Sequence, residues 1–247
     1  MKSQDQTPLT LVCRPGDAGE NLTQELASRG LPALWTPVIT IDFQLPALSL
    51  THKAYDILIF ISANAVRGCP ENLIHSNQTR CRFITVGAST AKMLNECFGL
   101  TNIEVPEQQN SEGLLAIESL KKVKGSRIAI IKGMGGRKLL AQTLRQREAQ
   151  VEEISVYRRL PKPIPEKLST TILAASTWYA VISSVEILEQ FHQYVGTKQL
   201  DVRQMHLVVV SQRIFDVAKH LNFVHIHLTK ANNAAIIKTL TQHIYPL

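Results

Sequence analysis

RIAIIKGMGGRKLLAQTLRQREAQVEEISVYRRLPKP, the stretch from Arg127 to Pro163, contains a complete unit of strand, turn, helix and strand. Its first strand is apolar, its turn is rich in glycine, its helix is amphipathic, and its second strand is unusually long. The stretch from Leu9 to Phe43, LTLVCRPGDAGENLTQELASRGLPALWTPVITIDF, has the same order of patterns. These two stretches indicate that the chain contains an internal duplication.

The duplication extends along most of the 247 residues. Three further pairs of segments match in pattern and order: DILIFISANAV (Asp56 to Val66) with WYAVISSVEIL (Trp178 to Leu188), RFITVGASTAKML (Arg82 to Leu94) with HLVVVSQRIFDVAKHL (His206 to Leu221), and EVPEQQNSEGLLAIESL (Glu104 to Leu120) with HLTKANNAAIIKTL (His227 to Leu240). Strands that alternate with helices favour a parallel sheet covered by helices. The sequence therefore predicts an α/β protein with two doubly wound parallel-sheet domains of similar topology.

Two long strand patterns, at 34–43 and 151–160, exceed the five or six residues of an average strand. We expect each of them to begin in one sheet and end in the other, so that together they form a two-stranded hinge. The first domain is then discontinuous and comprises residues 1–37 and 161–247, while residues 38–160 form an inserted second domain. Because clefts between domains commonly bind ligands, the sequence predicts the functional site there.

The N-terminal sequence MKSQDQTPLT is polar, and the chain has no run of about eighteen apolar residues. These features predict a cytoplasmic protein without a membrane partner. The cysteines are widely spaced and lack CxxC spacing, which favours free thiols. His225 and His227 have no neighbouring acid or cysteine that completes a ligand set, so no metal site is predicted.

The formal net charge of +7 favours an anionic partner. The basic residues are spread over the whole chain, and no helix-turn-helix, zinc-finger or aromatic single-strand motif is present, so no nucleic-acid partner is predicted. A small polyanion fits this distribution of charge. The alternative is a basic surface that is merely solvated.

Small or polar residues follow the apolar strand patterns at several turns. The candidate anion donors among them are Ser62, Asn64, Gly87, Gly133, Ser183 and Ser211. In open α/β sheets these turns share one edge, where helix N-termini present N–H groups and a positive dipole end to anions. Serine and asparagine are also preferred N-caps in the absence of a ligand, so a structural role for each turn stays open.

No group of residues resembles a nucleophile with its base. The turn GMGGRK, Gly133 to Lys138, lacks the GxGxxG and GK[ST] patterns, so nucleotide binding is not indicated. Tyr157 is different because it lies in the second long strand, between Val156 and the pair Arg158 and Arg159, where the cleft is expected. It is therefore a candidate catalytic residue. A tyrosine at the edge of the core is the alternative.

Taken together, these segments resemble the uroporphyrinogen-III synthase family over almost the entire chain. The resemblance rests on LVCRP (Leu11 to Pro15), IFISANAV (Ile59 to Val66), TVGASTAKML (Thr85 to Leu94), SEGLL (Ser111 to Leu115) and KGMGGRKLLAQTLRQREAQVEEISVYRR (Lys132 to Arg159). The family has two α/β domains, the first of them discontinuous, joined by two strands. The resemblance implies a monomeric hydro-lyase of heme biosynthesis that needs no cofactor.

The resemblance also implies the reaction. The substrate is expected to be hydroxymethylbilane, a linear tetrapyrrole with many carboxylates. The enzyme is expected to close it to uroporphyrinogen III with loss of water and inversion of ring D through a spirocyclic intermediate. A transient contact with the preceding deaminase is expected as well. A flexible polyanion needs many N–H donors and diffuse positive charge, which agrees with the turns and with the net charge.

The resemblance assigns roles to individual residues. Tyr157 is expected to protonate or hydrogen-bond the departing hydroxyl, and Thr90 to position the substrate. Arg14 and Arg137 are expected to pair with carboxylates, although they can instead brace the turns. The turns expected to donate to acetate and propionate groups are those of Ser62, Asn64, Gly87, Gly133 and Ser183.

The chain departs from the family's pattern at one turn. Where many members carry Gly-x-Thr-Thr, this chain has Ser211 and Arg213, which we expect to replace the missing donor with a different geometry. The rival interpretation of the whole chain is a noncatalytic, two-domain regulatory protein that binds a tetrapyrrole or another polyanion. Formation of the ring-inverted isomer distinguishes the two interpretations.

Overall fold

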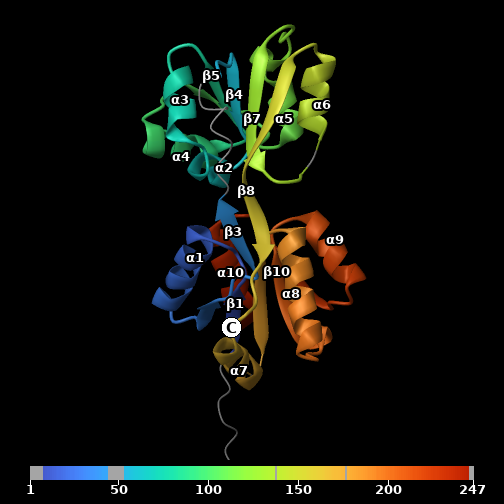
Figure 1. The fold of residues 1–247 in the computed structure, drawn as a ribbon. Coiled ribbons are helices and arrows are strands. Elements are labelled where there is room, and N and C mark those ends of the chain that lie inside the picture. Colours follow the sequence, from blue (N-terminus) through green and yellow to red (C-terminus); the bar gives the residue numbers. More distant parts are fainter. Residues whose placement is uncertain (1–7, 44–52, 137, 176, 245–247) are drawn as a thin grey trace, which may run out of the picture. The chain divides into compact units, whose positions relative to one another are not determined.

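The chain forms two compact units (Figure 1). Unit 1 comprises Met1–Ile41 and Leu160–Leu247, and unit 2 comprises Asp42–Arg159. In the part of the chain that is described, none of the helices has the length and apolar character that a membrane span requires. The computed structural model describes residues 8–43, 53–136, 138–175 and 177–244.

Unit 1 contains a parallel sheet of five strands with the order β11-β10-β9-β1-β2. Its strands are β1 (Leu9–Val12), β2 (Ala33–Trp35), β9 (Trp178–Ile182), β10 (Met205–Val209) and β11 (His225–Leu228). The central strands β1, β9 and β10 are buried on both faces, which explains why their sequences are almost continuously apolar.

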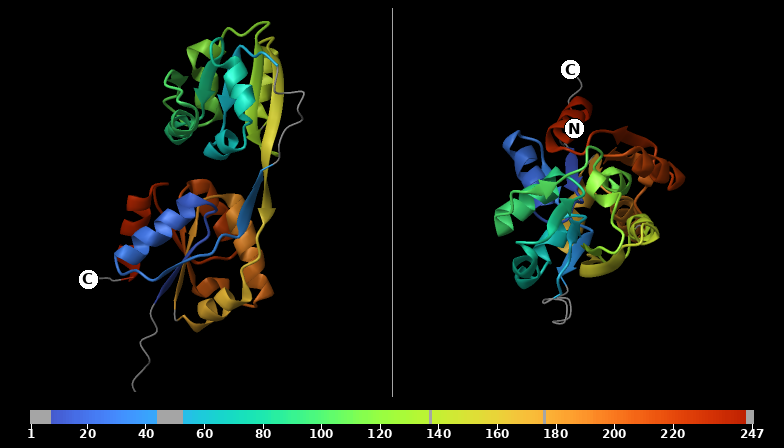
Figure 2. Two further views of the ribbon diagram at one scale, coloured as in Figure 1. Left: turned by 60° about the vertical axis from the view of Figure 1, so that its left-hand side comes forward. Right: turned by 90° about the horizontal axis from the view of Figure 1, so that it is seen from above.

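Helices cover both faces of this sheet (Figure 2). On one face, α1 and α10 bury Leu22, Leu26 and Ile236. On the other face, α8 and α9 bury Phe191 and Ile214. The bounds are α1 (Asp17–Ser28), α7 (Glu166–Ala174), α8 (Val185–Thr197), α9 (Gln212–His220) and α10 (Asn233–Ile244), with a 3-10 turn at Val202–Gln204.

Unit 2 is built around a sheet of six strands with the order β3-β8-β7-β4-β5-β6. The five strands from β4 to β8 are parallel. The bounds are β3 (Ile39–Phe43), β4 (Ile57–Phe60), β5 (Arg82–Thr85), β6 (Ile103–Glu104), β7 (Arg127–Gly133) and β8 (Gln150–Pro161).

This sheet is also covered on both faces (Figure 1). One face packs against α5 and α6, which bury Leu114, Leu140 and Leu144. The other face packs against α2, α3 and α4, which bury Leu73 and Leu94. The bounds are α2 (Ala63–Arg67), α3 (Glu71–Asn77), α4 (Ala88–Phe98), α5 (Ser111–Ala116) and α6 (Leu139–Gln146), with a 3-10 turn at Glu118–Leu120.

The two units have the same strand order. β2, β1, β9, β10 and β11 of unit 1 take the places that β8, β7, β4, β5 and β6 take in unit 2. These are the same pairs of segments that match in the sequence. The predicted fold class, α/β with two doubly wound parallel sheets of similar topology, is confirmed.

The segment 34–43, expected as one long strand, forms two strands instead. β2 ends at Trp35 and pairs with β1, whereas β3 begins at Ile39 and belongs to the six-stranded sheet. Pro37 lies between them, and proline has no N–H with which to continue a ladder. The prediction of a continuous strand is therefore wrong here. β8, by contrast, is a single strand of 12 residues.

β3 lies beside β8 at the edge of the six-stranded sheet. The carbonyl oxygen of Val38 accepts a hydrogen bond from the N–H of Lys162 at 2.8 Å, and Asp42 forms an ion pair with Arg158 at 2.7 Å. From the first pair to the second the residue number rises by four on the side of β3 and falls by four on the side of β8, so the two strands run antiparallel. The chain thus leaves unit 1 through β3 and returns to it through β8.

Four histidines of unit 1 stack at the end of its sheet. The ring centroid of His206 lies 4.5 Å from that of His225 and 5.5 Å from that of His227, and the rings of His227 and His243 lie 3.8 Å apart. Burial, followed by the neighbouring rings, lowers the pKa of His206 and lowers the pKa of His227 to about 4. Protonation of His206 and His227 is therefore unfavourable in the folded state.

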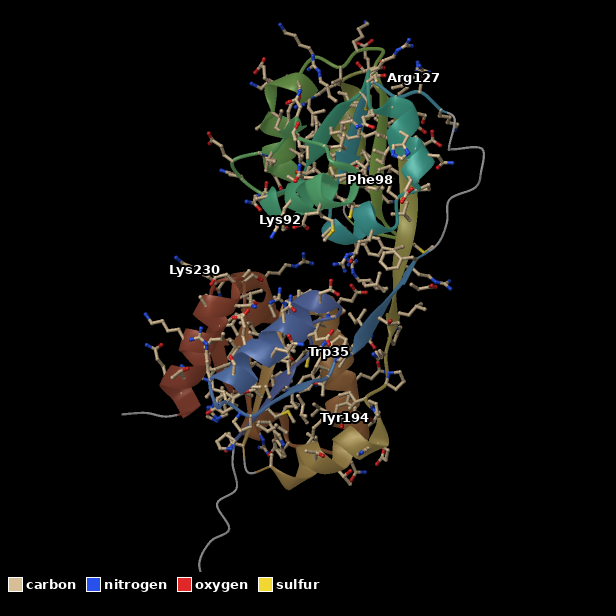
Figure 3. The ribbon with its side chains drawn as sticks, turned by 90° about the vertical axis from the view of Figure 1, so that its left-hand side faces the viewer. Trp35, Lys92, Phe98, Arg127, Tyr194 and Lys230 are labelled. Carbon is tan, nitrogen blue, oxygen red and sulfur yellow. The ribbon has the colours of Figure 1, made fainter. Side chains whose placement is uncertain are left out.

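The histidine cluster predicts a pH-dependent stability. Between the ordinary pKa of 6.5 and about 4, the unfolded chain binds more protons at His227 than the folded chain does. The contribution of His227 to the free energy of unfolding is therefore fully present above pH 6.5, and it is lost as the pH falls towards 4. Urea unfolding can be followed by the fluorescence of Trp35 (Figure 3) and Trp178, which both belong to unit 1.

His227→Gln is expected to flatten this decrease because it removes the group that gains the proton. His220→Gln, on α9 and outside the cluster, is the matched control and is expected to keep the decrease. If the wild type and His227→Gln differ by a constant amount from pH 7.5 to pH 4.5, the cluster is not the cause.

Asn77 connects α3 to the segment that precedes β4. Its Nδ2 donates to the carbonyl oxygens of Lys53 at 3.1 Å and Leu73 at 2.8 Å, and its Oδ1 accepts from the N–H of Tyr55 at 2.7 Å. Because Asn77→Ala leaves these buried groups without their partner, it is expected to lower the free energy of unfolding by about 2–3 kcal/mol. The measurement is urea unfolding followed by far-UV circular dichroism.

Asn95→Ala is the matched control for Asn77→Ala. The side chain of Asn95 donates one hydrogen bond, to the carbonyl oxygen of Leu100 at 3.1 Å. Its loss is expected to cost only about 1 kcal/mol. Equal losses in the two variants would contradict the account of Asn77.

Candidate functional site

Each sheet has a point at which the chain reverses its direction of travel across the strands. In unit 2 the chain moves from β4 through β5 to β6, and then returns to add β7 and β8 on the other side of β4. In unit 1 the equivalent point lies between β1 and β9. Ligands of open α/β sheets bind at the carboxyl ends of the strands at such points. The expected places for a ligand are therefore between β4 and β7, and between β1 and β9.

Ser62 follows β4 at this point of unit 2. Its Oγ accepts a hydrogen bond from the N–H of Ala65 at 3.0 Å and so caps α2. The same oxygen lies 3.1 Å from the phenol oxygen of Tyr157. Asn64 stands in the first turn of α2 beside this cap. Ser62 thus caps α2 and also contacts the hydroxyl of Tyr157.

Gly133 ends β7 and faces Tyr157 across the ladder with β8. Lys132 pairs with Ser155 but Gly133 pairs with Tyr157, so the register shifts by one residue at Val156. A Cβ atom at position 133 would lie 2.5 Å from Cζ of Tyr157. The bulge changes which side chain faces Gly133, and the missing Cβ leaves room for the ring.

The phenol oxygen of Tyr157 has two polar neighbours. In addition to Ser62, Nη2 of Arg159 donates a hydrogen bond to it at 3.1 Å, and Cζ of Arg159 lies 5.4 Å from the centroid of the ring. The centroid of the Phe43 ring lies 6.4 Å from the centroid of the Tyr157 ring. Tyr157 is only 3% exposed, so this arrangement holds the ring firmly. The phenol hydroxyl is thus oriented by the guanidinium of Arg159 and the hydroxyl of Ser62.

Gly87 and Thr90 lie at the next strand end of unit 2, where β5 leads into α4. The carbonyl oxygen of Gly87 accepts hydrogen bonds from Oγ1 of Thr85 at 3.2 Å and from the N–H of Thr90 at 3.1 Å. Thr90 is 2% exposed. Its backbone N–H thus closes the first turn of α4, and its side chain is buried. Its predicted role stays a prediction.

A pocket of about 310 Å³ lies on the α5 and α6 side of the same sheet. Lys132 lines it and forms an ion pair with Glu153 at 2.8 Å, while Arg145 contacts the other oxygen of Glu153 at 3.1 Å. The hydrogen bond from Lys132 is the main cause of the lowered pKa of Glu153. The pocket thus contains its own carboxylate, which already neutralises its buried lysine.

Arg14 follows β1 at the equivalent point of unit 1. Its Nη1 donates to Oδ1 of Asn233 at 3.3 Å, and Nδ2 of Asn233 donates to Glu25 at 2.7 Å. Burial lowers the pKa of Arg14. This contact is the bracing role that the sequence leaves open for Arg14. Pairing of Arg14 with a substrate carboxylate stays a prediction.

The remaining predicted residues of unit 1 lie at separate strand ends. Ser183 follows β9, but its neighbour Ser184 is the residue that caps α8, by accepting from the N–H of Ile187 at 3.2 Å. Ser211 caps α9, and Arg213 is exposed in the first turn of that helix. Among the described residues of unit 1, no hydrogen bond or ion pair joins these side chains to one another.

Of the predicted residues, the structure brings Ser62, Gly133 and Tyr157 together. Arg137 lies outside the described residues. The sequence analysis missed Arg159 as a member of this cluster. Alternation along a strand was the available signal, because residues two apart lie on one face. With Tyr157 facing the site, Arg159 has to face it as well.

Comparison with known proteins identifies the family. A family model described as uroporphyrinogen-III synthase HemD matches residues 20–237. The chain belongs to the uroporphyrinogen-III synthase family. The family's members are enzymes of heme biosynthesis, and their substrate is hydroxymethylbilane.

Two synthases show the extent of the similarity in sequence. The uroporphyrinogen-III synthase of Proteus mirabilis is 36% identical over 159 residues, which cover 61% of this chain and 79% of the relative. That of Escherichia coli (strain K12) is 28% identical over 242 residues, which cover 93% of this chain and 98% of the relative. The second match spans both units.

Two solved synthases share the fold. The structure of uroporphyrinogen-III synthetase from Helicobacter pylori 26695 has a TM-score of 0.63 at 13% identity and covers 97% of this chain and 100% of its own. A mutant uroporphyrinogen III synthase from the extremely thermophilic bacterium Thermus thermophilus has a TM-score of 0.61 at 17% identity and covers 96% and 97%. At these identities the likeness supports the fold alone.

The close approach of Gly133 to Tyr157 predicts the effect of adding one methyl group. Gly133→Ala is expected to displace the ring of Tyr157 and to reduce uroporphyrinogen III formation about 100-fold, because a misplacement of about 1 Å is enough for such a loss. It is also expected to lower the free energy of unfolding by about 1–3 kcal/mol through overpacking. Activity and urea unfolding are measured on the same preparation.

Gly196→Ala provides the matched control. Gly196 is exposed in α8, and a Cβ there meets no atom within 4 Å. The variant is expected to keep full activity and to gain about 0.5–1 kcal/mol in free energy of unfolding. Full activity of Gly133→Ala would show that the Tyr157 ring does not have to occupy this place.

Proposed function

We propose that this chain closes hydroxymethylbilane to uroporphyrinogen III and that Tyr157 assists departure of the hydroxyl group. The observation that carries the residue assignment is the phenol oxygen of Tyr157, held between Ser62 and Arg159 at the point where the sheet of unit 2 reverses. Membership of the family supports the reaction. The geometry supports the identity of the acid.

The reaction begins when the substrate's hydroxymethyl carbon loses its oxygen. Tyr157 donates its phenol proton to this hydroxyl, the carbon–oxygen bond breaks with its electron pair on oxygen, and water leaves. The remaining cationic azafulvene is attacked by the substituted carbon of ring D, which forms the spirocyclic intermediate. Rearrangement inverts ring D, and the ring carbon at which the macrocycle closes finally releases a proton, so that one water is lost overall.

The strand-end turns complete the proposal as binding groups. Helix N-termini present free N–H groups, and the net charge of +7 attracts a substrate that carries many carboxylates. The proposed donors lie at the ends of β4, β5, β7, β9 and β10, namely Ser62, Asn64, Gly87, Gly133, Ser183 and Ser211, with the side chains of Arg14, Arg137 and Arg213. Thr90 is proposed to position the substrate through α4.

We further propose that the protein acts as a cytoplasmic monomer, as its resemblance to the family implies. The substrate also closes without assistance, to the type I isomer that keeps ring D in its original direction. A transient contact with the deaminase that makes the substrate shortens the time available for this side reaction. Light scattering of the two proteins, alone and mixed, tests both the monomer and the contact.

Tyr157→Phe is expected to reduce the rate of uroporphyrinogen III formation about 100-fold, because it removes a positioned acid and keeps the ring. Hydroxymethylbilane is generated in place by a deaminase, the products are oxidised, and the type I and type III porphyrins are separated by chromatography. The wild type is expected to give mainly type III. If the folded wild type gives only type I, the chain is a binding protein.

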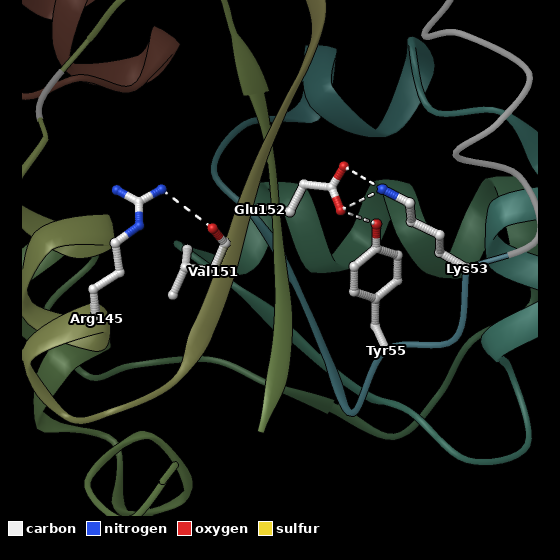
Figure 4. A network of polar contacts seen from close by, with 5 residues as sticks. All are labelled: Lys53, Tyr55, Arg145, Val151 and Glu152. Atoms are coloured by element: carbon white, nitrogen blue, oxygen red, sulfur yellow. Dashed lines mark hydrogen bonds and ion pairs between the residues drawn. The ribbon is translucent and has the colours of Figure 1, made fainter. Parts of the chain in front are cut away.

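Tyr55→Phe is the matched control for Tyr157→Phe. Tyr55 is also buried, and its hydroxyl donates to Oε2 of Glu152 at 2.8 Å beside Lys53 (Figure 4). This network lies at the amino end of the sheet, away from the strand ends that carry the site. Tyr55→Phe is expected to lose about 1 kcal/mol of stability and to keep the proportion of type III product. An equal loss of type III in both variants would contradict a specific role for Tyr157.

A further inference from the structure

Two adjacent arginines of β8 have different surroundings. Arg159 lies two residues after Tyr157, on the same face of the strand, and its Nη2 donates to the phenol oxygen at 3.1 Å. Arg158 points to the other face, where its Nε donates to Oδ2 of Asp42 at 2.7 Å. Arg159 therefore contacts the proposed acid, whereas Arg158 pairs with a carboxylate of β3.

Hydrogen-bond accounting excludes one direction for the phenol proton of Tyr157. A guanidinium group can only donate, so the phenol oxygen of Tyr157 must accept from Arg159. Oγ of Ser62 already accepts from the N–H of Ala65 and keeps one lone pair and its own proton, so either hydroxyl can donate in its contact with Tyr157. The phenol proton consequently points away from Arg159, towards Ser62 or a group that takes the place beside it.

The same contact affects the state that follows proton transfer. When Tyr157 gives its proton to the leaving hydroxyl, a negative charge forms on the phenol oxygen. Arg159 already donates to this oxygen, and its positive charge attracts a phenolate more strongly than a neutral phenol. A donor that strengthens as charge develops lowers the barrier rather than the energy of the bound substrate.

We propose that Arg159 is a positioning residue for the reaction: its guanidinium orients the phenol of Tyr157 and stabilises the phenolate until the proton returns from the closing ring. This inference rests on the proposed role of Tyr157 as the acid. The proton that leaves the ring carbon at closure restores the phenol, so the cycle balances without a further reactant.

Arg159→Gln tests the inference because it keeps hydrogen-bond donors and removes the charge. Its kcat is expected to fall about 10- to 100-fold with KM nearly unchanged. The alkaline limb of the pH profile of kcat/KM is expected to move to higher pH, a shift that a merely structural role does not produce. Arg159→Lys keeps the charge and is expected to restore the position of the limb but only part of kcat, since an ammonium lacks the planar fork.

Arg158→Gln is the matched control, and it is expected to keep the wild-type pH profile. In a Tyr157→Phe background, Arg159→Gln is expected to cause no further loss, because the two residues act as a unit. The inference is overturned if the two losses multiply, or if Arg159→Gln leaves the alkaline limb in place.

The outcomes also separate this inference from the proposal on which it rests. If Tyr157→Phe keeps the wild-type rate, Tyr157 is not the acid and both fail. If Tyr157→Phe is impaired and Arg159→Gln behaves like the wild type, only the inference about Arg159 fails. Circular dichroism of each variant establishes that it is folded, and Arg159→Lys supplies the test of charge if Arg159→Gln does not fold.

Discussion

The packing of the Tyr157 ring against the backbone of Gly133 is the constraint on which the site of unit 2 depends. It requires two departures from a regular sheet: a shift of register at Val156 and a position without a Cβ atom. Without the shift, the alternation of side chains along β8 would turn both Tyr157 and Arg159 to the opposite face. The polar cluster thus follows from the course of the backbone, and Ser62 only completes it.

The duplicated fold supplies two equivalent strand-end edges, but they carry different chemistry. The edge of unit 2 has a buried phenol, a cation and a hydroxyl within hydrogen-bond distance. The corresponding edge of unit 1 has Arg14, which is engaged by Asn233. The edge of unit 2 thus carries a buried phenol, whereas the edge of unit 1 carries cap and bracing contacts. The proposed function uses both edges, one for binding carboxylates and one for the proposed acid.

The repeats allowed the fold class to be predicted from sequence, because matching apolar strands and amphipathic helices recur in one order. Ser62 and Tyr157 could be singled out for the same reason, since both occupy ends or crossings of recognisable strands. The break at Pro37 was missed because the apolar pattern of 34–43 continues through it, and only the change of pairing partner reveals two strands. Arg159 follows from alternation once Tyr157 is placed at the site, but the bulge at Val156 that sets the face of both residues is a property of the ladder and not of the strand's own sequence.

The discontinuity of unit 1 has a consequence for the newborn chain. β1 and α1 leave the ribosome first, yet β1 pairs with β9, which is made only after all of unit 2. Unit 2 holds its five parallel strands in one continuous segment and can complete its core during synthesis. Until β9 is made, β1 can pair with β2 but lacks its partner on the other edge, and bringing β9 to it closes a very long loop at an entropic cost. Unit 1 therefore stays incomplete after unit 2 is finished, until β9 has emerged.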